Sequence, residues 1–183
     1  MDFLPDSNNG SRIILYLTDP GKVREGNIKI IKEAQKEGYT PIIITTNFPA
    51  SVLEKIYSQN EVDLAQVYFI DAISKYSMGG ASVVSDEHHI NTNNPSDLTG
   101  LSIAISEMLK RTSGKNIFLL VDSISTMLIY LPSVKISQFV HLVSSKIRIR
   151  NEYCIILAVD GGLDPILYSQ VSSLVDEIIK PEA

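Results

Sequence analysis

The chain has 183 residues, 44% of them hydrophobic, which is enough for one well-filled core and too little for two domains of ordinary size. Its formal net charge of −5 comes from 21 acidic and 16 basic residues that are scattered along the sequence. An acidic chain without a basic patch argues against general nucleic-acid binding, which depends on neutralising phosphates. Cys154 is the only cysteine, which excludes an internal disulfide framework and a cysteine-based metal site.

The first ten residues, MDFLPDSNNG, are polar and rich in turn-forming residues. We expect a flexible lead-in over residues 1–10 and a single domain over residues 11–183. The lead-in lacks the basic and then apolar pattern of a secretion signal. No apolar run approaches the roughly 18 residues of a membrane helix. These features predict a cytoplasmic protein that does not bind membranes.

Apolar runs alternate with amphipathic stretches in the first part of the chain. The expected strands are residues 11–18, 41–46 and 67–72, and the expected helices between them are residues 23–37 and 50–58. The first helix stops at Gly38, a residue typical of helix C-termini. This alternation predicts right-handed crossovers and a parallel sheet.

Residues 73–94 are the least regular part, with a short strand expected at 81–85 and a polar loop at 85–94. A strong amphipathic helix is expected from Pro95 to Gly114, because apolar residues recur there at helical spacing. The remaining expected elements are a strand at 117–121, a helix at 136–149, a strand at 153–159, a short helix at 165–172 and a closing strand at 176–180. The sequence therefore predicts an α/β fold with helices on both faces of a mostly parallel sheet.

The strand at residues 117–121 consists of five consecutive apolar residues, which is typical of a central strand buried on both faces. Asp122 follows at its carboxyl end, where open α/β sheets bind their ligands. One interpretation is that Asp122 holds Mg²⁺ through water in a nucleotide site. The other is that Asp122 ends the strand or caps the next helix. This stretch alone leaves both interpretations open.

From about Gly10 to Lys180, the order of these segments resembles the RecA-like core of KaiC-type ATPases. Residues 122–125, Asp-Ser-Ile-Ser, look like the end of that family's Walker-B strand, and residues 172–179, SSLVDEII, resemble its closing segment. Residues 94–99, NPSDLT, are similar to a segment of archaeal KaiC-like proteins of undefined role. The resemblance implies a three-layer P-loop NTPase fold.

The same resemblance implies where a nucleotide site would lie. Its residues would be Thr18, Asp19, Gly21, Lys22, Asp122 and Ser123. We expect the strand ending at Thr18 to lie beside the strand ending at Asp122, so that the two halves of this site meet.

The segment after the first strand departs from the family pattern. A working phosphate loop reads G-x-x-x-x-G-K-S/T, in which backbone N–H groups, a lysine and a hydroxyl hold the phosphates and Mg²⁺. Residues 18–26 read TDPGKVREG, so Lys22 follows a glycine but Val23 replaces the hydroxyl. Asp19 adds negative charge, and Pro20 removes a backbone donor. The segment therefore predicts an ordinary turn and a vestigial site.

KaiC-type enzymes also carry a pair of glutamates after the second strand, where this chain has Asn47 and Phe48. Neither side chain can act as a general base. We therefore expect a catalytically inactive domain without a cofactor. It would act as a regulatory or assembly module that self-associates or joins an intact KaiC-like ATPase.

Two alternatives remain open. The chain would bind ATP weakly or unusually through Lys22, Asp122 and Lys115, or it would be a nucleic-acid-binding RecA relative. The acidic balance of the chain argues against the second alternative.

Two further clusters of polar residues have ordinary explanations. Residues 86–89, Asp-Glu-His-His, contain competent metal ligands, but adjacent residues seldom converge on one ion, so we predict a solvated loop and no metal site. Lys146, Arg148 and Arg150 form a small basic group near the end of a helix. They would bind an acidic partner or interact favourably with the helix C-terminus.

Overall fold

The computed structural model describes residues 10–79 and 85–181. The expected lead-in, apart from Gly10, therefore lies outside the described residues. The same holds for the short strand expected at 81–85, apart from Ser85.

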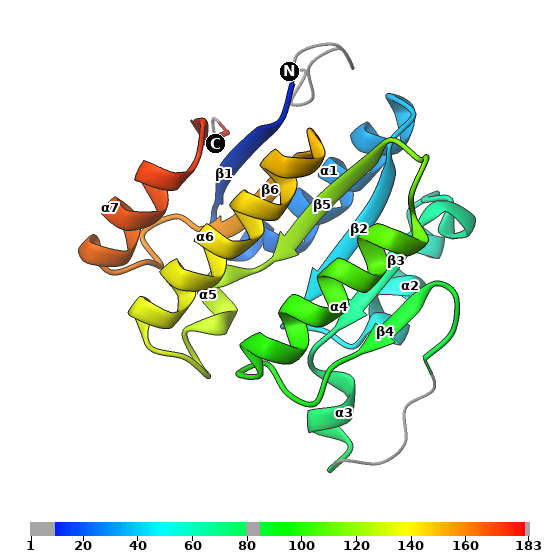
Figure 1. The fold of residues 1–183 in the computed structure, drawn as a ribbon, viewed down its shortest axis with the longest axis horizontal. Helices are drawn as coiled ribbons and strands as arrows, with labels where there is room; N and C mark the ends of the chain where they lie inside the picture. The colour runs from blue at the N-terminus through cyan, green and yellow to red at the C-terminus, as the bar shows by residue number, and fades with distance from the viewer. Residues whose placement is uncertain (1–9, 80–84, 182–183) are drawn as a thin grey trace.

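The described residues form a seven-stranded sheet in which every neighbouring pair is parallel. Its order is β4-β3-β2-β5-β6-β1-β7 (Figure 1). The strands are β1 (Arg12–Thr18), β2 (Thr40–Thr45), β3 (Tyr68–Asp71), β4 (His89–Asn91), β5 (Ile117–Asp122), β6 (Tyr153–Val159) and β7 (Glu177–Ile179). The prediction of an α/β fold around a parallel sheet is confirmed.

Helices cover both faces of the sheet and give three layers (Figure 1). One face carries α1 (Val23–Lys36) and α2 (Ala50–Gln59), and the other carries α4 (Leu98–Arg111), α6 (Ser133–Arg150) and α7 (Pro165–Leu174). The short elements are η1 (Pro20–Lys22), η2 (Leu64–Gln66), α3 (Ser74–Ser77) and α5 (Ile124–Met127). No helix in the described part of the chain combines the length and apolarity that a membrane crossing requires.

Each strand contributes side chains to both helical layers because successive residues point to opposite faces. In β1, Ile13 and Leu15 belong to the core on the face of the sheet that carries α4, α6 and α7, whereas Ile14 and Tyr16 belong to the core on the face that carries α1 and α2. All four are almost completely buried. Burial on both faces explains why these strands read as continuous apolar runs.

The strand β6 lies between β1 and β5, so the expectation that these two are neighbours is wrong. β6 pairs with β1 along its whole length and with β5 on its other side. An apolar run fits any interior position of a parallel sheet, so its composition does not specify its neighbours. The ends at Thr18 and Asp122 are consequently two strand spacings apart, or about 10 Å.

Two element boundaries in the middle of the chain differ from the prediction. Helix α4 begins at Leu98 rather than at Pro95, because the Asp97 side chain accepts a hydrogen bond from the Gly100 N–H and caps the helix there. The polar run at 85–94 is not only a loop, since His89–Asn91 forms β4 and pairs with β3. Strand β4 lies at the edge of the sheet and pairs with β3 alone. Its sequence is polar, so it was not predicted as a strand.

Candidate functional site

A cavity of about 1130 Å³ lies between α1 and α2, at the carboxyl ends of β2 and β5. The turn before α1, the loop after β2, the start of α5 and Val159 at the end of β6 complete its lining. Ligands of open α/β sheets bind at this edge, outside the carboxyl ends of the strands. The cavity is therefore the first place to examine for function.

Asp122, the last residue of β5, forms part of the cavity floor and is only 3% exposed. Its Oδ2 accepts a hydrogen bond of 2.6 Å from Asn27 Nδ2 in α1. Asn27 Oδ1 in turn accepts a hydrogen bond of 2.6 Å from the Tyr57 hydroxyl in α2. The other carboxylate oxygen, Oδ1 of Asp122, has no hydrogen-bond partner among the described residues. Three elements, β5, α1 and α2, thus meet at a carboxylate of which only one oxygen is hydrogen-bonded among the described residues.

Burial changes the acid–base properties of this network. Desolvation raises the pKa of Asp122 to about 6, although the hydrogen bond from Asn27 opposes the shift. Burial, and then the charge of Asp122, raise the pKa of Tyr57 well above its ordinary value. Near neutral pH, Asp122 is therefore mostly ionised and Tyr57 remains a hydrogen-bond donor.

Ser123 follows Asp122 through a cis peptide bond and is the N-cap of α5. Its Oγ accepts a hydrogen bond of 3.3 Å from the Thr126 N–H and lies 2.9 Å from Thr126 Oγ1. Asp122 therefore ends the strand, and Ser123 caps the next helix. The Ser123 hydroxyl is engaged with α5 rather than directed at a ligand.

The segment between β1 and α1 is a compact turn. Its 3-10 helix η1 is closed by a hydrogen bond of 2.9 Å from the Lys22 N–H to the Asp19 carbonyl. Lys22 Nζ lies 3.8 Å from Asp19 Oδ2, and both side chains are about half exposed. Thr18 is buried at the end of β1, where its carbonyl accepts a hydrogen bond of 2.8 Å from the Asp160 N–H. The Lys22 N–H is thus engaged within the turn, and the Thr18 carbonyl is engaged with the loop after β6.

The six residues of the expected nucleotide site line two different cavities. Thr18, Asp19 and Lys22 line a small cavity of about 150 Å³ beside β1. The other three line the large cavity: Gly21, Asp122 and Ser123. Glu25 and Lys29 line both cavities, which therefore adjoin, but Lys22 and Asp122 line different ones.

Lys115 does not join either group. It lies just before β5, at the end of that strand opposite to Asp122, and its Nζ donates to the Tyr68 hydroxyl at 2.6 Å. The inclusion of Lys115 among the binding groups is therefore wrong, because the strand separates it from the carboxyl edge.

Sequence analysis missed Asn27 and Tyr57, which hold Asp122. Asn27 lies on the buried face of α1 together with Ile30 and Ile31. Tyr57 lies on the buried face of α2, one turn after Leu53. A polar side chain at helical spacing within an apolar stripe is a detectable signal, since it must find a partner once buried.

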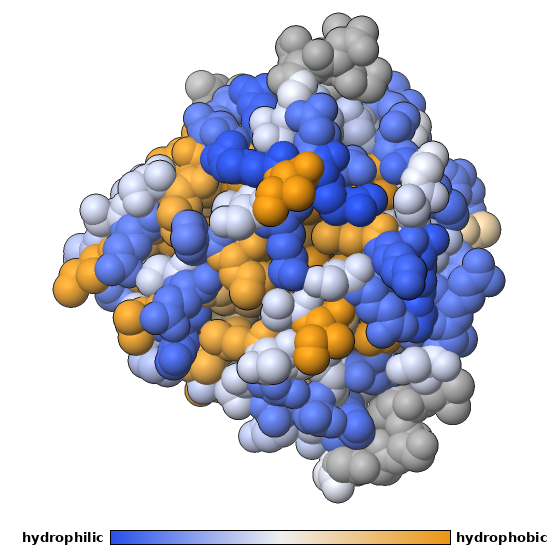
Figure 2. Space-filling model, in the orientation of Figure 1, coloured by the Kyte–Doolittle hydropathy of each residue, from blue (hydrophilic) through white to orange (hydrophobic). Residues whose placement is uncertain are grey.

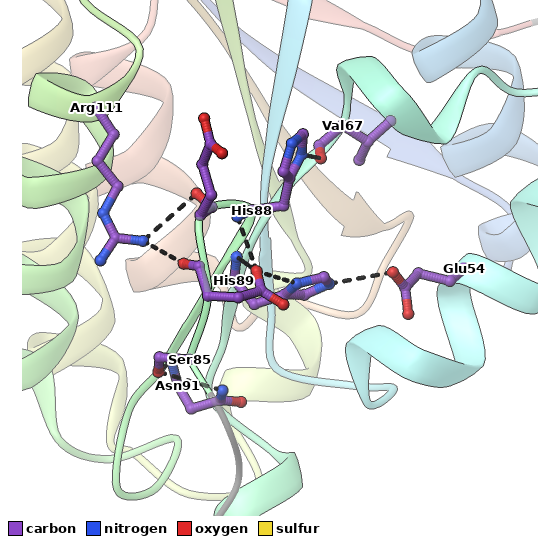
Figure 3. A network of polar contacts seen from close by, with 9 residues as sticks. Glu54, Val67, Ser85, His88, His89, Asn91 and Arg111 are labelled. Carbon is purple, nitrogen blue, oxygen red and sulfur yellow. Dashed lines mark hydrogen bonds and ion pairs between the residues drawn. The ribbon is translucent and has the colours of Figure 1, made fainter.

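The segment at residues 86–89 has a structural role (Figure 3). The imidazole of His89 lies between two carboxylates, with Nδ1 at 2.8 Å from Asp86 and Nε2 at 3.1 Å from Glu54. The His88 ring stacks on Tyr68 with centroids 4.4 Å apart. Within residues 10–79 and 85–181, no group of three or more potential ligands could hold a metal ion. These contacts fasten the edge strand β4 to β3 and α2.

Part of the small basic group is paired within the chain. Arg148 donates to the two carboxylate oxygens of Asp176 at 2.9 and 3.1 Å, and Lys146 donates to Ser106 Oγ at 2.5 Å. These contacts join α6 to the segment before β7 and to α4.

The fold is the α/β fold of KaiC-like proteins. The structure is similar to that of KaiC-like protein PH0186 from the hyperthermophilic archaeon Pyrococcus horikoshii, with a TM-score of 0.62 and 16% identity over 97% of this chain and 72% of the other. It is also similar to uncharacterized protein PH0321 from Pyrococcus horikoshii, solved in complex with an unknown peptide, with a TM-score of 0.68 and 12% identity over 95% of this chain and 78% of the other.

The chain belongs to a family of unknown function, DUF7504, whose profile matches residues 16–180. No curated protein matches its sequence significantly. At the identities of the two archaeal structures, the likeness establishes the fold alone.

Proposed function

We propose that this protein is a RecA/KaiC-like domain that does not hydrolyse ATP and acts as a regulatory or assembly module through protein–protein association. One observation carries the proposal: the turn between β1 and α1 lacks the glycine-rich pattern and the hydroxyl of a phosphate loop, and the Lys22 N–H donates to the Asp19 carbonyl inside the turn. A triphosphate and its metal ion need the lysine and the aspartate at one place.

The groups that would hold a triphosphate fit it poorly. The Lys22 N–H is used inside its own turn, and the Asp19 carboxylate lies beside the lysine ammonium. In the other half of the expected nucleotide site, Asn27 Nδ2 donates a hydrogen bond to Oδ2 of Asp122. Asn47 and Phe48 line the cavity where a general base would stand. These features support a degenerate phosphate loop, so we derive no reaction step through ATP.

The association half of the proposal rests on the surface of the molecule. Figure 2 shows apolar side chains on the face that carries α4, α6 and α7. Large exposed residues of these helices include Ile103 (62% exposed), Ile149 (85%) and Ile166 (70%). Exposed apolar patches often mark contacts with other proteins. The structurally similar PH0321, solved with a bound peptide, lends further support.

Phosphate release from ATP and Mg²⁺ by the purified chain tests the absence of activity. We expect no turnover above the buffer blank and the same result for Asp122→Asn. Turnover that Asp122→Asn abolishes would overturn the proposal.

Native mass measurement tests association. We expect a complex of the chain with itself or with an intact KaiC-like ATPase, and a chain that stays monomeric in both settings would contradict the proposal.

A second candidate function is weak or unusual ATP binding. The size of the large cavity and the position of Asp122 in its lining favour it. Calorimetric titration with ATP and Mg²⁺ distinguishes the two candidates. A dissociation constant near or below about 10 μM, lost in Asp122→Asn, would favour this alternative.

A further inference from the structure

The strand β7 lies at one edge of the sheet, and part of its backbone faces away from its neighbour. Among the described strands it pairs with β1 alone. The Asp176 N–H, just before β7, donates to the Ile13 carbonyl of β1 at 2.8 Å. Because the backbone groups of successive residues point alternately to the two sides of a strand, those of Ile178 also face β1. The backbone groups of Glu177 and Ile179 consequently face the open side, where another strand can pair with them.

The surface around this edge is apolar and uncharged. Helix α7 lies at this end of the molecule (Figure 1), and its sequence, PILYSQVSSL, contains no charged residue. Ile166 and Tyr168 of α7 are exposed, and Ile178 at the centre of β7 is 39% exposed. Ile178 lies on the same face of the sheet as α7, because its register partner Leu15 belongs to the core on that face. Depletion of charge around exposed apolar residues is typical of the centre of a protein interface.

The charged side chains next to the centre of β7 are already paired within the chain. The ion pairs are Arg12 with Glu177, Arg148 with Asp176, and Asp160 with Lys180. A strand that pairs with this edge therefore does not have to neutralise an isolated charge.

We propose that β7 pairs in antiparallel orientation with β7 of a second copy of this chain, across a two-fold axis at Ile178. The two sheets join into one continuous sheet, and the axis is perpendicular to it. Each helical layer therefore meets the same layer of the second copy. The inference rests on the association in the proposed function, and it names the surface and the partner.

The sequence of residues 176–180, DEIIK, complements itself in this register. Ile178 lies opposite Ile178 of the second copy, which places two apolar side chains together on the α7 face. Glu177 lies opposite Ile179 of the second copy, so their outward-facing backbone groups bond each other on both sides of the axis. Asp176 lies opposite Lys180 of the second copy, so opposite charges face each other.

The neighbouring registers fit less well. An axis at Glu177 would place two glutamates directly opposite each other, which destabilises a strand pair. An axis at Ile179 would place Glu177 opposite Pro181, which has no N–H to donate. Of these three registers, the one with its axis at Ile178 alone pairs the outward groups of Glu177 with those of Ile179.

Sedimentation of the purified chain over a range of concentrations tests the proposal. We expect a concentration-dependent species of twice the chain mass. Ile178→Lys and Ile178→Glu should each weaken self-association by about tenfold or more, because each places like charges opposite each other at the axis. An equimolar mixture of the two variants should form a dimer again, because lysine then faces glutamate. Only a residue that lies opposite itself gives this pattern.

Hydrogen exchange of single amides tests the pairing of the strands. In a dilute sample the amides of Glu177 and Ile179 should exchange quickly, as expected for an edge strand. In a concentrated sample they should slow by about tenfold or more, because association pairs them. The amide of Ile178 faces β1 in both samples and should change less.

The matched control is Val52→Lys, because Val52 is 38% exposed, nearly the same as Ile178. It lies on α2, which packs against β3 in the other half of the sheet. This variant should leave self-association unchanged, and circular dichroism confirms that each variant is folded.

The proposal is overturned if the wild type stays monomeric at every concentration, if neither Ile178 variant weakens self-association, or if their mixture forms no dimer. It is also overturned if association leaves the amides of Glu177 and Ile179 unprotected. Protection of these amides by an intact KaiC-like ATPase alone would assign the edge to another protein and overturn the second copy. A chain that fails these tests but binds such an ATPase still supports the proposed function, so the two failures are distinguishable.

Discussion

At the scale of single residues, Asp122 shows how burial creates a functional candidate. Its carboxylate is almost completely removed from solvent, yet only one of its two oxygens is hydrogen-bonded within the described chain. The folded protein therefore carries a penalty for ionising this group, which appears as a pKa of about 6. Proteins retain such groups at sites where another molecule completes the missing interaction.

This penalty predicts a pH dependence of stability. The pKa of Asp122 rises from 3.8 to about 6 on folding, so between these values the folded state binds more protons than the unfolded state. The free energy of unfolding contributed by Asp122 therefore falls as pH rises from about 4 to about 6 and stays low above that range. The full effect is up to about 3 kcal/mol.

Urea unfolding of the wild type and of Asp122→Asn across this pH range measures the effect. The variant lacks the titration, so its stability relative to the wild type should increase from pH 4 to pH 7. The exposed Asp63→Asn serves as the control and should show no comparable trend. A difference between Asp122→Asn and the wild type that does not change with pH would contradict the assignment.

At the scale of elements, Asp71 joins three neighbouring segments. Helix α2 begins after Pro49, which provides no side-chain cap, and the Ala50 N–H instead donates to Asp71 Oδ2 from β3 at 2.7 Å. The same carboxylate accepts bonds from the N–H groups of Ile73 and Ser74 and from the Ser74 hydroxyl. One buried carboxylate thus satisfies the starts of α2 and α3 together.

We expect Asp71→Ala to lower the free energy of unfolding by about 2–4 kcal/mol, because it leaves several buried donors without an acceptor. The matched control is Asp97→Ala, which removes a single capping bond at the start of α4 and should cost about 1 kcal/mol. Chemical denaturation of both variants gives the comparison. Equal losses would show that the loop after β3 rearranges to replace the carboxylate.

At the scale of the whole molecule, the order of the strands decides which residues can act together. β6 separates β1 from β5, and Asp19 and Lys22 line a smaller cavity than the one that Asp122 lines, whereas Pro20 and Gly21 of the same turn line the cavity of Asp122. The order also places β2, β5 and β6 in the interior of the sheet and the three-residue strands β4 and β7 at its edges.

Native-state hydrogen exchange should follow this order. Amides of β5 and β6 are expected to exchange most slowly, because both strands are paired on both sides and covered on both faces. Amides of β4 and β7 should exchange fastest among the strands. Equal protection of β7 and β5 would indicate that another chain pairs with that edge.

The sequence by itself determined most of the strand and helix segments, the parallel sheet and the position of Asp122 at its carboxyl edge. Those features depend on local periodicity and on continuous apolar runs, which the chain displays directly. Only the tertiary structure decided that β6 lies between β1 and β5, that His89–Asn91 forms an edge strand, and that Asn27 and Tyr57 hold Asp122. These results depend on contacts between residues far apart in the chain. Helical spacing can mark Asn27 and Tyr57 as buried polar residues, but it does not say which partner each one contacts.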